Sequence, residues 1–248
     1  MSRRRFFAPP EAFNRQTVTL TGDEARHLRE VLRLRAGDEV FVFDGAGKEF
    51  CCTVESARRD EALLGQCHEV APAHEESPLQ LMLAVALLKG EKFDLVVQKT
   101  TELGVSGIIP VMTRNADIRL NDATDAEKRV KRWQRVAIEA AKQCGRASVP
   151  TIPLPLSVDS LIRDSEYPLR VMFAERDGTC LDDSLSSVSS PTSGLALIGS
   201  EGGWTADELL AARNSGWKIV TLGGRILRAE TAAIAAMVLL QNKLGDLG

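Results

Sequence analysis

The chain has 248 residues, of which 44% are hydrophobic and 26% charged, with 19 glycines and 10 prolines. This composition is that of an ordinary globular protein and excludes a disordered or fibrous one. The net charge of −3 excludes a strongly basic, chromatin-like protein. The longest apolar run, residues 81–88, is far shorter than the roughly 20 residues of a membrane-spanning helix. The five cysteines are scattered and odd in number, which predicts a reduced, cytoplasmic protein.

The charge is distributed unevenly along the chain. Residues 1–35 and 78–150 each carry a net charge of +4, whereas residues 36–77 carry −7 and residues 151–248 carry −4. Two basic segments separated by acidic ones are consistent with a polyanionic partner that meets part of the surface. Solvated helix faces without any partner would give the same pattern.

The N-terminal third is typical of short strands with one helix. We expect strands at residues 18–20, 39–43, 49–54 and 63–70, with a glycine turn at 44–47. Thr21 and Glu24 have the spacing of a capping box, and the helix they open would bury Ala25, Leu28, Val31 and Leu32. This pattern predicts a small barrel or sandwich. The proline-flanked stretch 71–78 predicts a linker, so we divide the chain into residues 1–74 and 75–248.

Beyond residue 75 strands alternate with helices. Apolar runs predict strands at residues 79–88, 108–112, 169–174, 195–199 and 219–222. Helical spacing predicts helices at 93–103, 130–144, 206–216 and 229–244, with Trp133 in the core and a capping box from Thr205 to Glu208. This alternation predicts an α/β domain with a mainly parallel sheet.

Glycine-bearing loops follow three of these strands, at residues 174–178, 198–204 and 222–231. Ligands of α/β sheets bind at the carboxyl ends of strands, so the three loops predict a binding crevice. The phosphate-binding fingerprints of P-loop and dinucleotide-binding proteins are absent. All three histidines precede residue 75, which makes a histidine-dependent triad or a zinc site in the α/β domain improbable.

Two sequence runs carry a specific resemblance. IGSEGGWTADE at 198–208 and LGGRILRAETAA at 222–233, with the final GDLG, resemble the SPOUT superfamily of methyltransferases. More narrowly, the chain is similar to the small-subunit (16S) ribosomal RNA uridine-N3 methyltransferases. Residues 31–38, 89–110 and 139–152 agree with that family. Ser200 and Gly224 stand where members usually carry proline.

The resemblance implies a fold and an activity. It implies an α/β methyltransferase domain of the SPOUT type with a trefoil knot, preceded by an N-terminal PUA-like, RNA-binding β-barrel domain. It also implies a homodimer that uses S-adenosylmethionine (SAM) to methylate N3 of one uridine in 16S ribosomal RNA. The alternatives are a SPOUT enzyme that acts on tRNA or a ribose 2′-hydroxyl, and a non-catalytic RNA-binding assembly factor.

The resemblance and the charge pattern also nominate site residues. The cofactor pocket would be lined by Glu175, Gly199, Glu201, Gly202, Gly203, Leu222, Gly223, Ile226, Leu227 and Ala229. Arg114 and Arg228 would stabilise the uracil anion, and Glu230 would orient an arginine or accept the proton. An ion pair of Arg228 with Glu230 that only fixes the loop is an equal alternative. Candidate RNA contacts are Arg3, Arg4, Arg5, Arg29, Arg33, Arg35, Lys89, Lys92, Lys99 and Arg146. We expect no metal.

Overall fold

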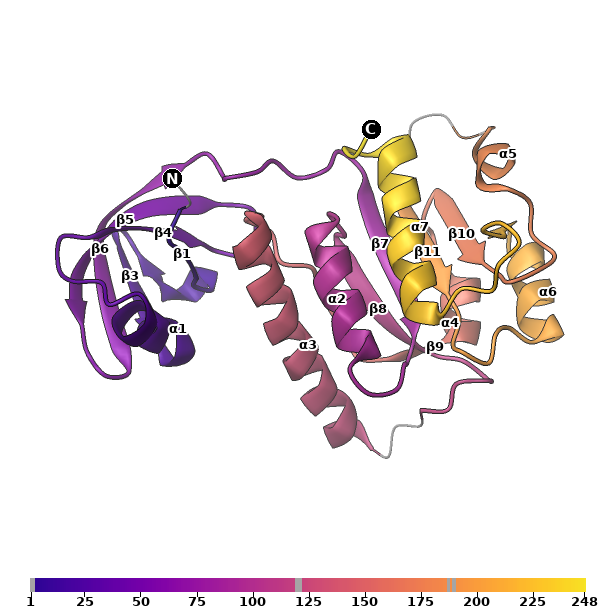
Figure 1. Cartoon of the computed structure of the whole chain (residues 1–248), viewed down its shortest axis with the longest axis horizontal. Helices are drawn as coiled ribbons and strands as arrows, with labels where there is room; N and C mark the ends of the chain where they lie inside the picture. The colour runs from indigo at the N-terminus through magenta and orange to yellow at the C-terminus, as the bar shows by residue number, and fades with distance from the viewer. Residues whose placement is uncertain (1–2, 119–121, 187, 189–190) are drawn as a thin grey trace. The chain divides into compact units, whose positions relative to one another are not determined.

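A computed structural model describes residues 3–118, 122–186, 188 and 191–248, which form two compact units (Figure 1). Unit 1 contains the residues up to Glu76 and the segment Ile138–Val149, and unit 2 contains Ser77–Ala137 and Pro150–Gly248. The sequence pattern did not predict that residues 138–149 belong to the first unit.

Unit 1 is built on one curled sheet with the strand order β1-β4-β5-β6-β3-β2. All neighbours are antiparallel except β1 and β4, which are parallel. Alternate residues such as Val40, Val42, Val54 and Leu64 fill the core. The curled sheet confirms the predicted small barrel, although the barrel is only half closed. The strands are β1 (Arg5–Phe7), β2 (Phe13–Asn14), β3 (Thr17–Thr21), β4 (Glu39–Phe43), β5 (Glu49–Ala57) and β6 (Glu61–Val70), with a 3-10 turn, η1 (Pro10–Ala12).

The helix after β3 differs from its prediction. Thr21 makes no side-chain capping hydrogen bond, and the Glu24 carboxylate accepts a hydrogen bond from the backbone N–H of Phe7 and pairs with Lys142. The short α1 (Gly22–Arg26) continues as a π-helical turn, η2 (His27–Val31). This wider turn changes the helical spacing. The predicted apolar face is therefore only half right: Ala25 and Leu28 are buried, but Val31 and Leu32 are 64% and 38% exposed.

The prediction of five reduced cysteines is wrong for two of them. Cys52 on β5 and Cys67 on β6 form a disulfide between neighbouring strands. Cys51, Cys144 and Cys180 are free. Sequence spacing could not identify this pair, because 15 residues and a strand reversal separate the two thiols.

Unit 2 contains a six-stranded sheet with the order β12-β10-β11-β7-β8-β9, and every neighbouring pair in it is parallel. This confirms the predicted parallel α/β architecture. The central strand β7 is apolar along nearly its whole length because both of its faces are covered. The strands are β7 (Gln80–Ala86), β8 (Gly107–Met112), β9 (Leu156–Ser157), β10 (Leu169–Phe173), β11 (Ser193–Ile198) and β12 (Lys218–Val220).

Helices cover the sheet on both sides. In Figure 1, α2 and α7 lie together over one face, whereas α4 and α6 share a core with alternate residues of β8, β10 and β11. Trp133 is buried and packs on Phe93 with ring centroids 4.1 Å apart, as expected of a core residue. No described helix is long and apolar enough to cross a membrane. The helices are α2 (Lys92–Glu102), α3 (Ala123–Cys144), α4 (Val158–Asp164), α5 (Leu181–Leu185), α6 (Ala206–Asn214) and α7 (Ala229–Leu244).

Candidate active site

The three glycine-bearing loops converge because the strands before them are neighbours. β12, β10 and β11 lie side by side and run in the same direction, so the loops that follow them leave from one edge of the sheet. Together they enclose a cavity of about 220 Å³ in unit 2. It is lined by Phe173, Ala174, Glu175, Ile198, Gly199, Ser200, Glu201, Trp204, Thr221, Leu222, Arg225, Ile226, Leu227, Arg228, Ala229 and Ala232.

Most of the residues nominated for a cofactor pocket lie in this lining. They are Glu175, Gly199, Glu201, Leu222, Ile226, Leu227 and Ala229. Gly202, Gly203 and Gly223 belong to the same loops but lie outside the lining. Of the three catalytic candidates, Arg228 lines the cavity, whereas Glu230 and Arg114 do not.

Two glycines of the loop after β11 are fixed by close neighbours. A Cβ atom at Gly199 would lie 3.0 Å from the indole ring of Trp204, and one at Gly202 would lie 2.7 Å from the carbonyl oxygen of Asn115. The loop therefore needs residues without side chains at these positions. Trp204 itself donates from Nε1 to the carbonyl oxygen of Phe173, 2.8 Å away. This bond ties the loop to the end of β10.

Sequence reasoning missed several lining residues. Ile198, Ser200, Trp204, Arg225 and Ala232 lie inside the two motifs, and Ala174 lies inside a predicted loop. Phe173 and Thr221 directly precede predicted loops, so position at a strand end was the available signal. The missed residues are Phe173, Ala174, Ile198, Ser200, Trp204, Thr221, Arg225 and Ala232.

Ser200 has an unusual environment. The residue is only 6% exposed, and its Oγ atom is buried without a hydrogen-bond partner among the described residues. A buried hydroxyl without a partner costs free energy. A polar ligand group in the cavity that Ser200 lines would remove that cost.

A group of charged residues lies beside the cavity. Nζ of Lys92 lies 2.7 Å from Oε1 of Glu201 and 4.0 Å from Oε2 of Glu230, an oxygen without a hydrogen-bond partner. Burial alone would raise the pKa of Glu201, but the hydrogen bond and charge of Lys92 outweigh it, so this pKa lies below its ordinary value. The hydrogen bond to Glu201 in turn raises the pKa of Lys92. Both groups are therefore charged at neutral pH.

The loop after β8 is attached to the loop after β11 and to α6. The backbone N–H of Arg114 donates to Glu208, and Nη1 of Arg114 lies 3.0 Å from Oδ2 of Asp207. Nδ2 of Asn115 donates to the carbonyl oxygen of Gly202 at 3.1 Å. Glu208 also completes the predicted capping box with Thr205, which this structure confirms. The Arg114 guanidinium remains half-exposed.

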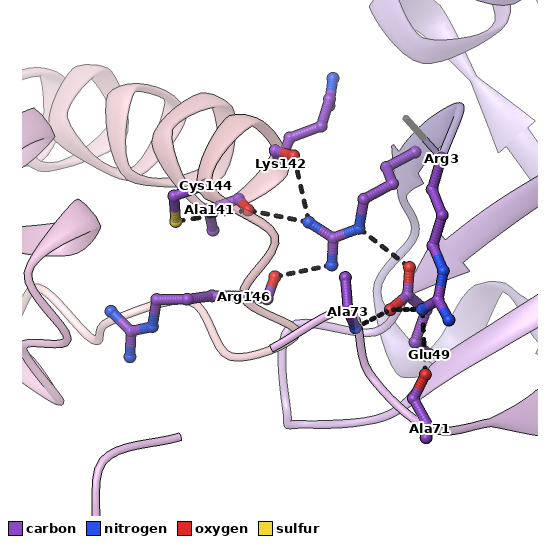
Figure 2. A network of polar contacts seen from close by, with 9 residues as sticks. Arg3, Glu49, Ala71, Ala73, Ala141, Lys142, Cys144 and Arg146 are labelled. Carbon is purple, nitrogen blue, oxygen red and sulfur yellow. Dashed lines mark hydrogen bonds and ion pairs between the residues drawn. The ribbon is translucent and has the colours of Figure 1, made fainter. Parts of the chain in front are cut away.

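In unit 1, Arg5 is buried rather than at the surface. Its hydrogen-bond partners Glu49, Ala141, Lys142 and Arg146 are labelled in Figure 2. Its Nε donates to Glu49 at 2.9 Å, and its other nitrogens donate to the carbonyl oxygens of Ala141, Lys142 and Arg146. The first two carbonyls belong to the last turn of α3, where a helix leaves acceptors unpaired, and that of Arg146 lies just beyond the helix. The donors of Arg5 are therefore satisfied inside the unit, which argues against the predicted RNA contact of this residue.

Two other nominated arginines are also held within unit 1. Arg146 is 6% exposed and pairs with Glu76, with Nη2 and Oε2 2.6 Å apart. Its burial likewise argues against a phosphate contact. Arg3 donates to Glu49 and to the carbonyl oxygen of Ala71, both at 2.9 Å, but about a third of its side chain stays exposed.

The remaining nominated basic residues are accessible, though several are paired. Arg4 is half-exposed and 3.7 Å from Asp38, and Arg33 and Arg35 are exposed. The other three pair with acids close to them: Arg29 with Glu30, Lys89 with Asp117 and Lys99 with Glu102. Exposed pairs of this kind are weak and can exchange partners. The described residues contain no His, Cys, Asp and Glu cluster suited to a metal.

Comparison with known families matches both parts of the chain. Residues 75–241 match the RNA methyltransferase domain family, and residues 20–66 match the RNA methyltransferase PUA domain family. The chain belongs to this family of RNA methyltransferases.

Several proteins similar to this chain are named for methylation of small-subunit ribosomal RNA. The chain is 32% identical to ribosomal RNA small subunit methyltransferase E of Synechocystis, covering 94% of this chain and 75% of the relative. It is 31% identical to the Bacillus subtilis protein of the same name, covering 89% and 88%. A Neisseria gonorrhoeae ribosomal RNA small subunit methyltransferase E bound to SAM matches both chains over their full length, with 32% identity and a TM-score of 0.87. A Legionella pneumophila methyltransferase in complex with SAM matches equally fully, with 31% identity and a TM-score of 0.90.

Proposed function

We propose that this protein is a SAM-dependent methyltransferase that methylates N3 of one uridine in 16S ribosomal RNA. The observation that carries the proposal is the cavity enclosed by the loops after β10, β11 and β12. Its position at the carboxyl edge of the sheet is where α/β proteins bind their ligands. Relatives named for methylation of small-subunit ribosomal RNA, one of them solved with bound SAM, support the SAM-dependent methylation of ribosomal RNA on which this proposal builds.

The residues of the cavity suit this cofactor. Phe173, Ile198 and Leu227 offer apolar surface for an adenine ring, and Glu175 and Glu201 offer carboxylates for hydroxyl or ammonium groups. The buried hydroxyl of Ser200 lacks a partner that a polar ligand group would supply.

The chain's own residues would prepare the nucleophile. The bound cofactor supplies a methyl group on a sulfonium, which needs no further activation. Uracil N3 carries a proton and attacks well only as that proton leaves. Arg228, in the cavity wall, would stabilise the developing negative charge on a uracil oxygen, with Arg114 as the second candidate. Glu230, whose Oε2 lacks a hydrogen-bond partner, would receive the proton.

RNA would be held mainly by exposed basic residues. In unit 1 these are Arg4, Arg33 and Arg35 together with the partly exposed Arg29, and in unit 2 they include Lys89. Phosphate contacts of this kind give affinity, whereas a target base turned out of its stack gives selectivity.

The remaining expectations from the resemblance complete the proposal. They are a SPOUT-type trefoil knot, a division into domains 1–74 and 75–248, a homodimer and a cytoplasmic location. One observation is consistent with the knot: after the edge strand β12 the chain returns through the loop at 221–228, and α7 packs on the central strands β7 and β11. Sedimentation analysis tests the dimer.

Three measurements test the function. Calorimetry with SAM separates a methyltransferase from a non-catalytic assembly factor, which would bind no cofactor. Transfer of a labelled methyl group to small subunits, compared with tRNA, separates the proposed substrate from other RNAs. Base analysis of the product separates N3 of uridine from a ribose 2′-hydroxyl.

A further inference from the structure

Lys92 connects α2 to the cavity loop that follows β11. It is the first residue of α2, and its Nζ donates a hydrogen bond of 2.7 Å to Glu201, which lines the cavity. The two side chains are 35% and 30% exposed. Glu230, in the first turn of α7, places a second carboxylate oxygen 4.0 Å from the same ammonium. Lys92 thus lies between two acids from two different elements.

This arrangement does not favour a phosphate contact. The Lys92 ammonium lies 2.7 Å from the Glu201 carboxylate and 4.0 Å from that of Glu230, and the Arg228 guanidinium is a second cation that acts on it. The charge of Lys92 is therefore engaged by acids of the chain itself. A lysine that serves RNA needs to present its charge to the phosphates. The Glu201 carboxylate, which belongs to the cavity lining, favours a ligand that carries positive charge, such as a sulfonium or an ammonium group.

We propose that Lys92 is a positioning residue of the cofactor cavity: its ion pair holds the Glu201 carboxylate and the loop after β11 in place for a cationic methyl donor. This inference rests on the proposed function, because it names the ligand of that site. The pair acts through Glu201, since Lys92 itself does not line the cavity. Replacing Lys92 by an acid would bring three carboxylates together and displace the loop.

Lys99 provides a matched control. It lies on the same helix, its side chain is 40% exposed, and it pairs with an acid, Glu102, that does not line the cavity. The same substitutions at Lys92 and Lys99 therefore change the net charge equally. Only those at Lys92 alter the cavity loop.

The experiment is calorimetric titration of SAM into the full-length protein and its variants, each checked for folding by circular dichroism. We expect Lys92→Glu to weaken SAM binding about tenfold and Lys92→Ala about threefold, as for loss of a partly exposed pair. Lys92→Arg, which keeps the charge, should stay within about twofold of the wild type. Lys99→Glu should leave the affinity unchanged.

Other outcomes overturn the inference. It is wrong if Lys92→Glu binds SAM like the wild type, or if Lys99→Glu weakens binding by the same factor. It is also wrong if Lys92→Ala keeps its SAM affinity but lowers the salt slope of RNA binding by about one, the signature of a lost phosphate contact. Failure of the wild type to bind SAM contradicts the proposed function itself and removes this inference with it.

Discussion

The side-chain amide of Asn115 donates a hydrogen bond to the backbone of Gly202, and the backbones of the two residues lie in close contact. Nδ2 of Asn115 donates to the carbonyl oxygen of Gly202 at 3.1 Å, and a Cβ atom at position 202 would lie 2.7 Å from the Asn115 carbonyl oxygen. Two loops that are 87 residues apart in sequence therefore pack backbone against backbone. The motif glycine at 202 is needed for this packing rather than for lining the cavity.

Gly202→Ala should therefore disturb the cavity even though residue 202 does not line it. The new methyl group overlaps a backbone atom that cannot rotate away, at a cost of about 1–3 kcal/mol. We expect a melting temperature lower by several degrees and SAM affinity reduced about tenfold. Gly224→Ala is the control, because nothing lies within 4 Å of a Cβ atom there. Equal effects of the two substitutions in melting and calorimetry would contradict this explanation.

Ser200→Ala should have opposite effects on the free and the ligand-bound protein. The substitution removes a buried hydroxyl that has no hydrogen-bond partner. The free protein should therefore be as stable as the wild type or more stable by about 1 kcal/mol. If a cofactor group normally pairs with this hydroxyl, SAM affinity should fall several-fold. Chemical denaturation and calorimetry measure the two quantities. Unchanged affinity would show that no cofactor group contacts Ser200.

Arg5→Ala should destabilise unit 1 strongly. The substitution removes donors from the carbonyl oxygens of Ala141 and Lys142 in the last turn of α3 and from that of Arg146 just beyond it. It leaves Glu49, which is completely buried, with Arg3 and the backbone of Ala73 as partners. We expect a loss of about 3 kcal/mol in the free energy of unfolding. Arg4→Ala, at an exposed neighbour, should cost less than about 1 kcal/mol. Similar denaturation midpoints for the two variants would argue against the buried network.

The Glu201 carboxyl should titrate below its ordinary pKa of 4.5. Because the folded pKa is lowered, its contribution to stability is present above the unfolded pKa and is lost as the pH falls through the folded pKa. The Lys92 pKa is raised, so its contribution is present below 10.5 and is lost as the pH rises through the folded value. NMR titration of the Glu201 carboxyl carbon measures the shift. In Lys92→Met the pKa should move upward, and an unchanged value would contradict the ion pair.

The sequence predicted the parallel sheet and the cavity loops well, because both leave local signals. Apolar runs such as 79–88 reveal buried strands, and glycines at strand ends reveal loops that approach each other or a ligand. Position in the motif could not separate Gly199, which lines the cavity, from Gly202, which packs on Asn115. That distinction depends on a loop distant in sequence.

The distribution of charge along the sequence did not predict which basic residues are exposed and which are buried. Arg4 and Arg5 are adjacent and chemically identical, yet one is half-exposed and the other is buried against Glu49. Arg5 is the first residue of β1 and bonds to the segment 138–149 that returns to unit 1, whereas Arg4 precedes the strand. The π-helical turn at 27–31 likewise exposed two residues that ordinary helical spacing would bury.

Reverse transcription across 16S ribosomal RNA from a strain that lacks this protein tests the central claim most directly. Methylation at N3 blocks the Watson–Crick edge of uracil and stops the transcriptase. We predict that one stop at a uridine, present in wild-type RNA, disappears in the deletion strain and returns when purified protein and SAM are added to its small subunits. Identical stop patterns in the two strains would contradict the assignment.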